Sequence, residues 1–295
     1  MTNNPIFRGA ATALITPLNE NGVDYERLGS VIDWQIKQGI NALVIAGTTG
    51  EGSTLSDEEH RAVLKYSTDR VAGRVPVIAG TGSNDTAHCI DMCREAQQLG
   101  ADGLLLVTPY YNKTSQRGLI AHYTKVAAST DLPMILYNVP SRTGVNIAPE
   151  TMATLYNTAD NIVGIKEASG NISAVAKIAA LCDAPIYSGN DDQIVPILSM
   201  GGAGVISVLS NIVPQVVHDI CAKWFAGDVN GSRDLQLQYL DLANALFTDV
   251  NPIPVKAAMN KMGMDVGECR LPLYPMEETA LAALEAVMQR HGLCN

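Results

Sequence analysis

The chain has 295 residues, of which 47% are hydrophobic, and its formal net charge is −10 at pH 7. This length suffices for a large buried core, and the negative charge argues against nucleic acid or an anionic membrane as the main partner. No apolar run approaches the roughly 20 residues of a membrane helix, and the N-terminus lacks the pattern of a signal peptide. We therefore expect a cytoplasmic protein whose six cysteines, which include no CxxC pair, are reduced and mostly buried.

Short apolar segments alternate with longer amphipathic ones through the first three-quarters of the chain. The predicted strands are Ala11–Thr16, Ala42–Ala46, Val75–Gly80, Gly103–Val107, Pro133–Tyr137, Ile162–Lys166, Pro185–Ser188 and Gly204–Val208. Strands that alternate with helical patterns indicate βαβ units and a parallel sheet. The second, fourth and eighth strands each follow a glycine that would end a helix, at Gly39, Gly100 and Gly202. This repeat favours a (β/α)8 TIM barrel over the alternative, an open doubly wound sheet.

The segments between the strands carry signals for the starts and ends of helices. One helix is predicted to start at Asp24, a second at Ser56, which can form a capping box with Glu59, a third at either Asn84 or Asp85, and a further one at Pro149. The predicted helix ends include Gly39 and Gly100.

After the last predicted strand the pattern is wholly helical. The predicted helices are Pro214–Phe225, which completes the barrel, and then Ser232–Phe247, Pro254–Met262 and Met276–His291. We therefore expect a barrel that carries the active site over residues 1–226 and a C-terminal helical domain over residues 227–295. Because no low-complexity linker separates the two, the appendage should pack on the barrel.

The segment Val163-Gly164-Ile165-Lys166 is an apolar strand that ends in a lysine. Side chains alternate between the two faces of a strand, so Val163 and Ile165 share one face and Lys166 takes the other. If the apolar pair faces the helices, Lys166 points into the barrel. Burial disfavours the ammonium form, and a neutral amine is a nucleophile toward carbonyl groups. A lone lysine at a strand end more often reaches solvent, so its surroundings decide between these interpretations.

The active site of such a barrel lies at the C-terminal ends of its strands. The residues at those ends are Thr16-Pro17, Gly47 to Glu51, Gly80 to Gly82, Thr108 to Asn112, Tyr137 to Arg142, Lys166-Glu167, Ser188 to Asn190 and Ile206-Ser207. They supply one lysine, several hydroxyl groups and an arginine, but no histidine and no carboxylate cluster of the kind that binds a metal. This inventory favours catalysis by an amine with hydroxyl groups as proton carriers, and no metal.

Three features near these ends suit a carbonyl substrate with carboxylate groups. Tyr137 ends the strand next to that of Lys166 and could carry protons, although a core tyrosine is the alternative. The loop Gly47-Thr48-Thr49-Gly50-Glu51-Gly52 lacks a P-loop signature, but its N–H groups and hydroxyls could bind a carboxylate as well as form a tight turn. Arg142 offers a fork for a second carboxylate, unless it is a solvated surface arginine.

Six segments in this order resemble the dihydrodipicolinate synthase family, a group of pyruvate-dependent class I aldolases related to N-acetylneuraminate lyase. They are Gly47 to Glu51, Thr108 to Asn112, Tyr137 to Gly144, Gly164 to Gly170, Gly204 to Val208 and Asn251 to Lys256, and the likeness runs from about Phe7 to the C-terminus. The resemblance implies that Lys166 forms a Schiff base with pyruvate and that Tyr137, Thr48 and Tyr111 form a proton relay. Tyr111 would reach across a tight dimer interface.

The resemblance also implies the remaining parts of the site. Thr49 would bind the carboxylate of pyruvate and Arg142 that of L-aspartate 4-semialdehyde, while the backbones of Gly189 and Ile206 would line the pocket. The product would be 4-hydroxy-tetrahydrodipicolinate, on the route to diaminopimelate and lysine, with no cofactor because the imine withdraws the electrons. A homotetramer built from two tight dimers is implied as well. The alternatives are a related aldolase, such as a sialate or sugar-acid lyase, and a non-catalytic barrel that binds a carboxylate.

Members of the family that lysine inhibits bind it in a cleft at the dimer interface. The matching positions here are Gly52, Ser53, Asp57, His60, Asn84, His88 and Tyr110. His88 stands where an acidic residue usually holds the lysine amine, so the resemblance leaves inhibition by lysine open. We expect the other histidines, His122, His218 and His291, to be surface or packing residues, and Lys256 in the Asn-Pro-Ile-Pro-Val-Lys segment to have a structural role.

Overall fold

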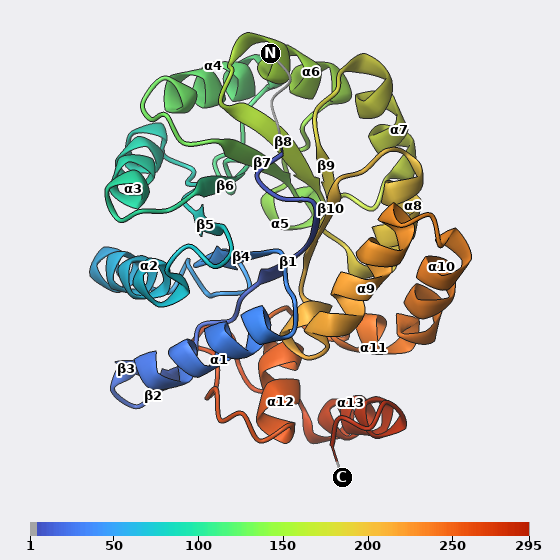
Figure 1. Cartoon of the computed structure of the whole chain (residues 1–295). Helices are drawn as coiled ribbons and strands as arrows, with labels where there is room; N and C mark the ends of the chain where they lie inside the picture. The colour runs from blue at the N-terminus through green and yellow to red at the C-terminus, as the bar shows by residue number, and fades with distance from the viewer. Residues whose placement is uncertain (1–4, 295) are drawn as a thin grey trace.

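A computed structural model describes residues 5–294 and shows a closed barrel of parallel strands surrounded by helices (Figure 1). The barrel strands are β1 (Gly9–Ala13), β4 (Ala42–Ile45), β5 (Val77–Gly80), β6 (Gly103–Val107), β7 (Met134–Asn138), β8 (Ile162–Glu167), β9 (Ile186–Ser188) and β10 (Gly204–Ser207). Neighbouring strands follow the order β1-β10-β9-β8-β7-β6-β5-β4, and β1 pairs with β4 to close the ring. The (β/α)8 prediction is confirmed, and the open-sheet alternative is wrong.

The first strand lies earlier than predicted, and a small hairpin follows it. β1 ends at Ala13 rather than Thr16, because Leu14 and Ile15 continue the apolar run as buried loop residues; the Ile15 N–H donates to the Asn211 side chain at 3.2 Å. The chain then forms an antiparallel pair, β2 (Leu18–Asn19) and β3 (Gly22–Val23), which the sequence analysis did not predict.

The helices that cover the barrel begin and end close to the predicted positions. They are α1 (Tyr25–Lys37), α2 (Asp57–Val71), α3 (Thr86–Gln98), α4 (Gln116–Ala127), α5 (Pro140–Thr143), α6 (Pro149–Thr158), α7 (Ile172–Leu181), α8 (Ile194–Ser199) and α9 (Pro214–Phe225), with short 3₁₀ turns η1 (Asp191–Gln193) and η2 (Leu209–Asn211). The capping box of Ser56 and Glu59 is present, and Asp85 rather than Asn84 caps α3. Pro149 occupies the first position of α6, as predicted.

Four further helices form the C-terminal part, which lies against one side of the barrel next to α1 and α9 (Figure 1). They are α10 (Val229–Gln238), α11 (Leu240–Ala245), α12 (Ile253–Lys261) and α13 (Glu278–Arg290). The single helix predicted over Ser232–Phe247 is wrong, because the chain turns at Tyr239, whose ring stacks on His291 at 4.7 Å between centroids. The division of domains at residues 226 and 227 stays a prediction.

The barrel has two buried apolar layers, one inside the ring and one between the ring and its helices. In β6, Leu105 belongs to the inner layer while Leu104 and Leu106 belong to the outer one, as strand alternation requires. In β8 the outer residues are Ile162 and Ile165, because the pairing with β7 shifts register between Met134 and Ile135. Val163, which lies at this shift, belongs to neither layer, so its predicted place beside Ile165 on the outer face is not confirmed.

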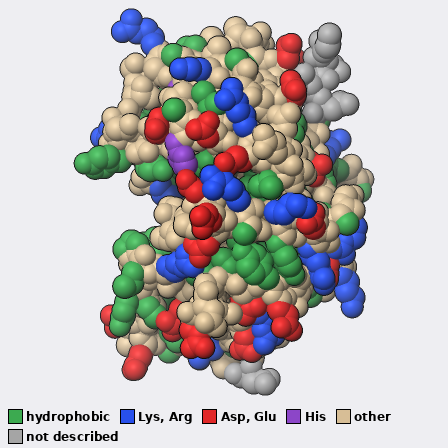
Figure 2. Space-filling view, turned by 90° about the vertical axis from the view of Figure 1, so that its left-hand side faces the viewer, with side chains coloured by type: hydrophobic (Ala, Val, Ile, Leu, Met, Phe, Trp, Pro, Cys, Tyr) green, Lys and Arg blue, Asp and Glu red, His purple; other side chains and the backbone are tan. Residues whose placement is uncertain are grey.

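The surface that carries α2 and α3 is mixed in charge. On the face drawn in Figure 2, acidic and basic side chains are interspersed, and ion pairs such as Arg61 to Glu95, at 2.8 Å, join neighbouring helices. A face of this kind offers no continuous basic stripe that could follow a phosphate backbone.

A buried ion pair joins α12 to the loop after β4. Lys256 Nζ donates to Glu51 Oε1 at 2.8 Å, to the Thr16 carbonyl at 3.2 Å and to the Glu268 carbonyl at 2.7 Å. The other oxygen of Glu51 accepts the backbone N–H of Arg270 at 2.8 Å. Both charged side chains are buried, so the pair fixes the C-terminal part against the loop that contains Thr48 and Thr49.

Replacing Lys256 with methionine should therefore lower the free energy of unfolding by about 3–5 kcal/mol, because the Glu51 carboxylate would remain buried without a countercharge. Denaturation in urea measures this change. The double variant Glu51→Gln/Lys256→Met removes both charges and should recover most of the loss. A single variant within about 1 kcal/mol of the wild type would show that the pair contributes little.

Candidate active site

The amine of Lys166 and the ring of Tyr137 lie together at the C-terminal end of the barrel. Tyr137 in β7 pairs directly with Lys166 in β8, and Lys166 Nζ lies 4.3 Å from the centroid of the phenol ring. Lys166 is only 5% exposed and Tyr137 only 8% exposed. The structure thus brings together the two side chains that strand alternation predicted to meet, inside the ring and away from bulk water.

Their burial changes the proton affinity of both groups. Burial lowers the pKa of Lys166 to about 8; the negative charge of Asp191 opposes this change, and the positive charge of Arg142 adds to it. Burial raises the pKa of the Tyr137 phenol, which Arg142 and a hydrogen bond with Thr48 partly offset. Near pH 8 the site therefore combines a partly neutral amine with a protonated phenol, a nucleophile beside a proton donor.

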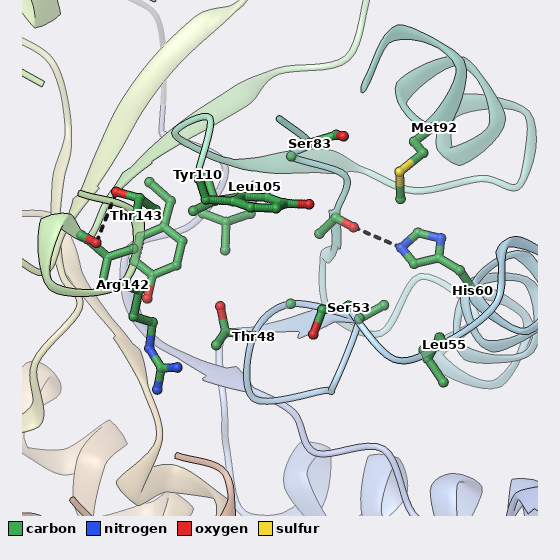
Figure 3. A pocket seen from close by; sticks show the side chains of 18 of the residues that line it. Thr48, Ser53, Leu55, His60, Ser83, Met92, Leu105, Tyr110, Arg142 and Thr143 are labelled. Atoms are coloured by element: carbon green, nitrogen blue, oxygen red, sulfur yellow. Dashed lines mark hydrogen bonds between the residues drawn. The ribbon is translucent and has the colours of Figure 1, made fainter. Parts of the chain in front are cut away.

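A cavity of about 430 Å³ opens from this end of the barrel toward α2 and α3. Figure 3 shows Thr48 and Arg142 at its barrel end and His60 and Met92 at its far end. Tyr137 lines the cavity, whereas Lys166 does not and lies against the phenol ring. Tyr137 thus has contact with both the open space and the amine.

Two groups suited to anions are found near the barrel end of the cavity: Arg142, which lines it, and Thr49, which does not line it but directly follows the lining residue Thr48. Thr49 follows β4 and is buried, and its Oγ1 accepts a hydrogen bond from Asn251 Nδ2 at 3.0 Å. Arg142, in the short helix α5, donates from Nη2 to the carbonyl of the same Asn251 at 3.0 Å. Asn251 comes from the C-terminal part, and the sequence analysis noted it only as the first residue of a motif. The hydroxyl and the guanidinium provide two separate donors for carboxylates.

Gly189 and Ile206, predicted to line the pocket through their backbones, do not line this cavity. A Cβ atom at Gly189 would come within 3.1 Å of Lys166 Cε and 2.6 Å of the Ala168 side chain, so only glycine fits there without a shift of its neighbours. Ile206 is fully buried in the inner layer of the barrel.

Comparison with known proteins finds relatives that match this chain over nearly its full length. A model of the dihydrodipicolinate synthetase family matches residues 6–291. The 4-hydroxy-tetrahydrodipicolinate synthase of a Thermoanaerobacter species is 52% identical, with 98% of each chain covered, and that of Lachnoclostridium phytofermentans is 56% identical, with 98% of this chain and 99% of the relative covered. The crystal structure of dihydrodipicolinate synthase from Thermotoga maritima matches with a TM-score of 0.96 at 41% identity, with 98% of this chain and 100% of that chain covered.

This chain belongs to the dihydrodipicolinate synthetase family. The match spans the barrel and the C-terminal helices together. In the part of the chain that the structure describes, no helix is long and apolar enough to cross a membrane. Over the same residues, no group of three or more His, Cys, Asp or Glu side chains is placed to hold a metal ion.

Tyr111, which the family resemblance placed in the proton relay, lies outside the cavity. Its side chain is 90% exposed, and its backbone is held at a positive φ of 66°. Within a single chain the structure does not bring Tyr111 together with Tyr137 and Thr48.

The residues assigned to a lysine-effector cleft of the family line the cavity, with one exception. Ser53, His60, His88 and Tyr110 line it, whereas Asn84 does not and donates from Nδ2 to the Tyr110 carbonyl at 3.2 Å. His60 is buried, its Nε2 bonds the Gly80 carbonyl at 2.9 Å, and burial lowers its pKa. A neutral imidazole in that bond donates from Nε2.

Asp191, for which no role was predicted, acts on the Lys166 amine through its negative charge. Its Oδ2 accepts the backbone N–H groups of Val208 and Leu209, at 3.0 and 2.8 Å, and its side chain is buried. The only signal in the sequence was an acidic residue just after a strand end.

Proposed function

We propose that this chain is a 4-hydroxy-tetrahydrodipicolinate synthase, a Schiff-base-forming lyase that condenses pyruvate with L-aspartate 4-semialdehyde. The observation that carries this proposal is the Lys166 amine, buried against the Tyr137 ring with its pKa lowered to about 8. The names of relatives that match over their full length support the choice of reaction. A structure of the Acinetobacter baumannii enzyme, 42% identical, is a complex with pyruvate and supports the first substrate.

In the first half of the reaction, neutral Lys166 attacks the carbonyl carbon of pyruvate. The carbinolamine that forms must take up a proton and lose water to become an imine, and the phenol of Tyr137, hydrogen-bonded to Thr48, supplies that proton. Thr49 and the N–H groups of its loop hold the carboxylate of pyruvate. The positive imine then withdraws electrons, so the methyl group loses a proton, which returns to the Tyr137 phenolate, to give an enamine. No cofactor is required because the imine itself is the electron sink.

In the second half, the enamine carbon forms a bond with the aldehyde carbon of the semialdehyde. Arg142, at the barrel end of the cavity, holds the carboxylate of this second substrate. The substrate amine next adds to the imine carbon and the bond to Lys166 breaks, which closes the ring and returns the free lysine. Gly189 leaves room beside the Lys166 side chain for these intermediates.

We place the enzyme in the cytoplasm as a homotetramer, a dimer of tight dimers, in which Tyr111 of one copy completes the proton relay of its partner. The exposure of the Tyr111 side chain, outside its own cavity, supports a role in a second copy. The far end of the cavity is the proposed lysine site, and a structure of the Cyanidioschyzon merolae enzyme, 39% identical, has lysine bound. Because His88 replaces the usual acidic residue, the assignment needs a direct test, which is the initial rate with and without lysine. Inhibition by lysine would support a lysine site here, and an unchanged rate would contradict it.

Imine formation should depend on pH through Lys166. Because the neutral amine is the nucleophile, the rate of trapping by pyruvate and borohydride should rise with pH, with a midpoint near the Lys166 pKa of about 8, and level off only at higher pH, where the amine is fully neutral. Quenched-flow trapping over a range of pH gives this profile. A midpoint near the ordinary lysine pKa of about 10.4 would show that the amine is not desolvated as described.

The choice of aldehyde is the point on which this proposal differs from a sialate or sugar-acid lyase. With pyruvate present, turnover is expected with L-aspartate 4-semialdehyde and not with N-acetylmannosamine, because Arg142 matches a small carboxylate. A coupled assay with each acceptor measures this. Preference for N-acetylmannosamine would overturn the proposed substrate, while imine trapping without turnover of either aldehyde would favour a carboxylate-binding barrel.

A further inference from the structure

Asn251 connects the two groups proposed to bind carboxylates, although it belongs to the C-terminal part of the chain. Its side-chain Nδ2 donates to Thr49 Oγ1, and its backbone carbonyl accepts from Arg142 Nη2, both at 3.0 Å. Asn251 is only 5% exposed. Its Oδ1 is buried and has no hydrogen-bond partner among the described residues. The residue thus contacts both proposed carboxylate-binding side chains from one position that does not itself line the cavity.

The bond to Thr49 fixes the direction in which that hydroxyl can act. A hydroxyl has one proton to donate and can accept on its oxygen, whereas an amide N–H can only donate. Thr49 Oγ1 therefore accepts the hydrogen bond from Asn251 Nδ2, and no protein acceptor for the Thr49 proton is found among the described residues. The proton remains available for a carboxylate oxygen in the cavity.

The surroundings hold Asn251 and Thr49 at a fixed separation. Glu51, two residues after Thr49, and Lys256, five residues after Asn251, form the buried ion pair described above. The backbone N–H of Lys256 bonds the carbonyl of Pro252 at 3.0 Å, which ties the start of α12 to the residue next to Asn251. Both sides of the Asn251–Thr49 contact are thereby anchored in buried structure, so its geometry is preorganised.

We propose that Asn251 is a positioning residue that makes Thr49 a donor toward the carboxylate of pyruvate and places Arg142 for the second substrate. This inference rests on the proposed function, because it takes Thr49 and Arg142 as the carboxylate-binding groups. It assigns a part of the active site to the C-terminal helical region rather than to the barrel.

The variant Asn251→Asp tests the direction of the hydrogen bond. A carboxylate at this position would accept the Thr49 proton and would add a negative charge behind an anion site. We expect the KM for pyruvate to rise about a hundredfold with a smaller change in kcat, and the rise in Asn251→Ala, which only removes the donor, to be about tenfold. An unchanged KM in Asn251→Asp would overturn the inference.

A double-mutant cycle keeps the test decisive if the aspartate variant folds poorly. Because Asn251 acts through Thr49, the effects of Asn251→Ala and Thr49→Val on the KM for pyruvate should be far from additive, and independent effects would overturn the inference. Asn260→Asp is the matched control: its side chain bonds Gly267 and Val266 away from the cavity, so it should change thermal stability without changing KM. Failure of the wild-type enzyme to trap pyruvate would instead overturn the proposed function.

Discussion

Replacing Lys166 with alanine is expected to lower kcat by about 10⁴-fold or more, because no other group can form the covalent imine. The fold should persist, since the side chain is a single buried amine whose removal leaves a small cavity beside Tyr137. Steady-state assays at saturating concentrations of both substrates measure the loss. Residual activity above about one per cent of the wild type would contradict a covalent role for this lysine.

Lys166→Arg is the matched control for charge and size. A guanidinium stays protonated at any working pH, so it cannot act as a nucleophile although it preserves the positive charge. Equal loss in the alanine and arginine variants would locate the effect in the chemistry of the amine. Substantial activity with arginine would instead indicate an electrostatic role.

Replacing Tyr137 with phenylalanine is expected to lower kcat by about 10²–10⁴-fold, the usual contribution of a positioned proton donor. The substitution removes only the hydroxyl and keeps the ring against the Lys166 amine, so the geometry of the amine should be retained. The loss should appear in kcat more than in the KM for pyruvate, because the proton is transferred in the reaction and not on binding. Steady-state kinetics with both substrates provide these values.

A second inward-facing tyrosine provides the comparison for Tyr137→Phe. Tyr187 in β9, the strand on the opposite side of β8 from β7, pairs directly with Lys166. Its hydroxyl, however, donates at 2.7 Å to the carbonyl of Phe7, a residue that precedes β1. Tyr187→Phe should therefore lower stability by about 1 kcal/mol while kcat changes little. Equal losses of kcat in the two variants would show that any perturbation next to Lys166 is harmful and that Tyr137 has no specific role in proton transfer.

Much of the barrel could be predicted because its signals are local and repeated. Each strand is a short apolar run, and the helix caps at Asp24 and Ser56 are formed by residues within a few positions of one another. The meeting of Lys166 and Tyr137 followed from alternation along two neighbouring strands. In contrast, the register shift beside Val163 depends on how β7 and β8 pack, and no pattern within β8 reveals it.

The parts of the site that could not be predicted depend on contacts between segments far apart in the sequence. The hydrogen bond from Asn251 to Thr49 spans 202 positions, and the ion pair of Lys256 with Glu51 spans 205. The break at Tyr239 coincides with stacking on His291 from the last helix. Thr49, Glu51, Asn251 and Lys256 lie in segments that stood out in the sequence, but nothing within either segment shows that the two meet, so the contacts become visible only when the C-terminal helices are placed on the barrel.

Two buried lysines, Lys166 and Lys256, lie near the C-terminal ends of the barrel strands, and their surroundings give them different roles. Lys256 donates to Glu51 and to two backbone carbonyls, so its nitrogen is fully engaged in structure. Lys166 lies instead over an aromatic ring, where burial lowers its pKa to about 8. The environment of Lys166 favours a neutral, reactive amine, whereas the nitrogen of Lys256 is held in three hydrogen bonds.

The most direct measurement is therefore the position of the reduced adduct after incubation of the wild-type enzyme with pyruvate and borohydride. Peptide mass spectrometry should find the adduct on the peptide that contains Lys166, and on no peptide of the Lys166→Ala variant. An adduct on Lys256 or on any other lysine, or the absence of an adduct from the wild-type enzyme, would contradict the account of Lys166 as the nucleophile.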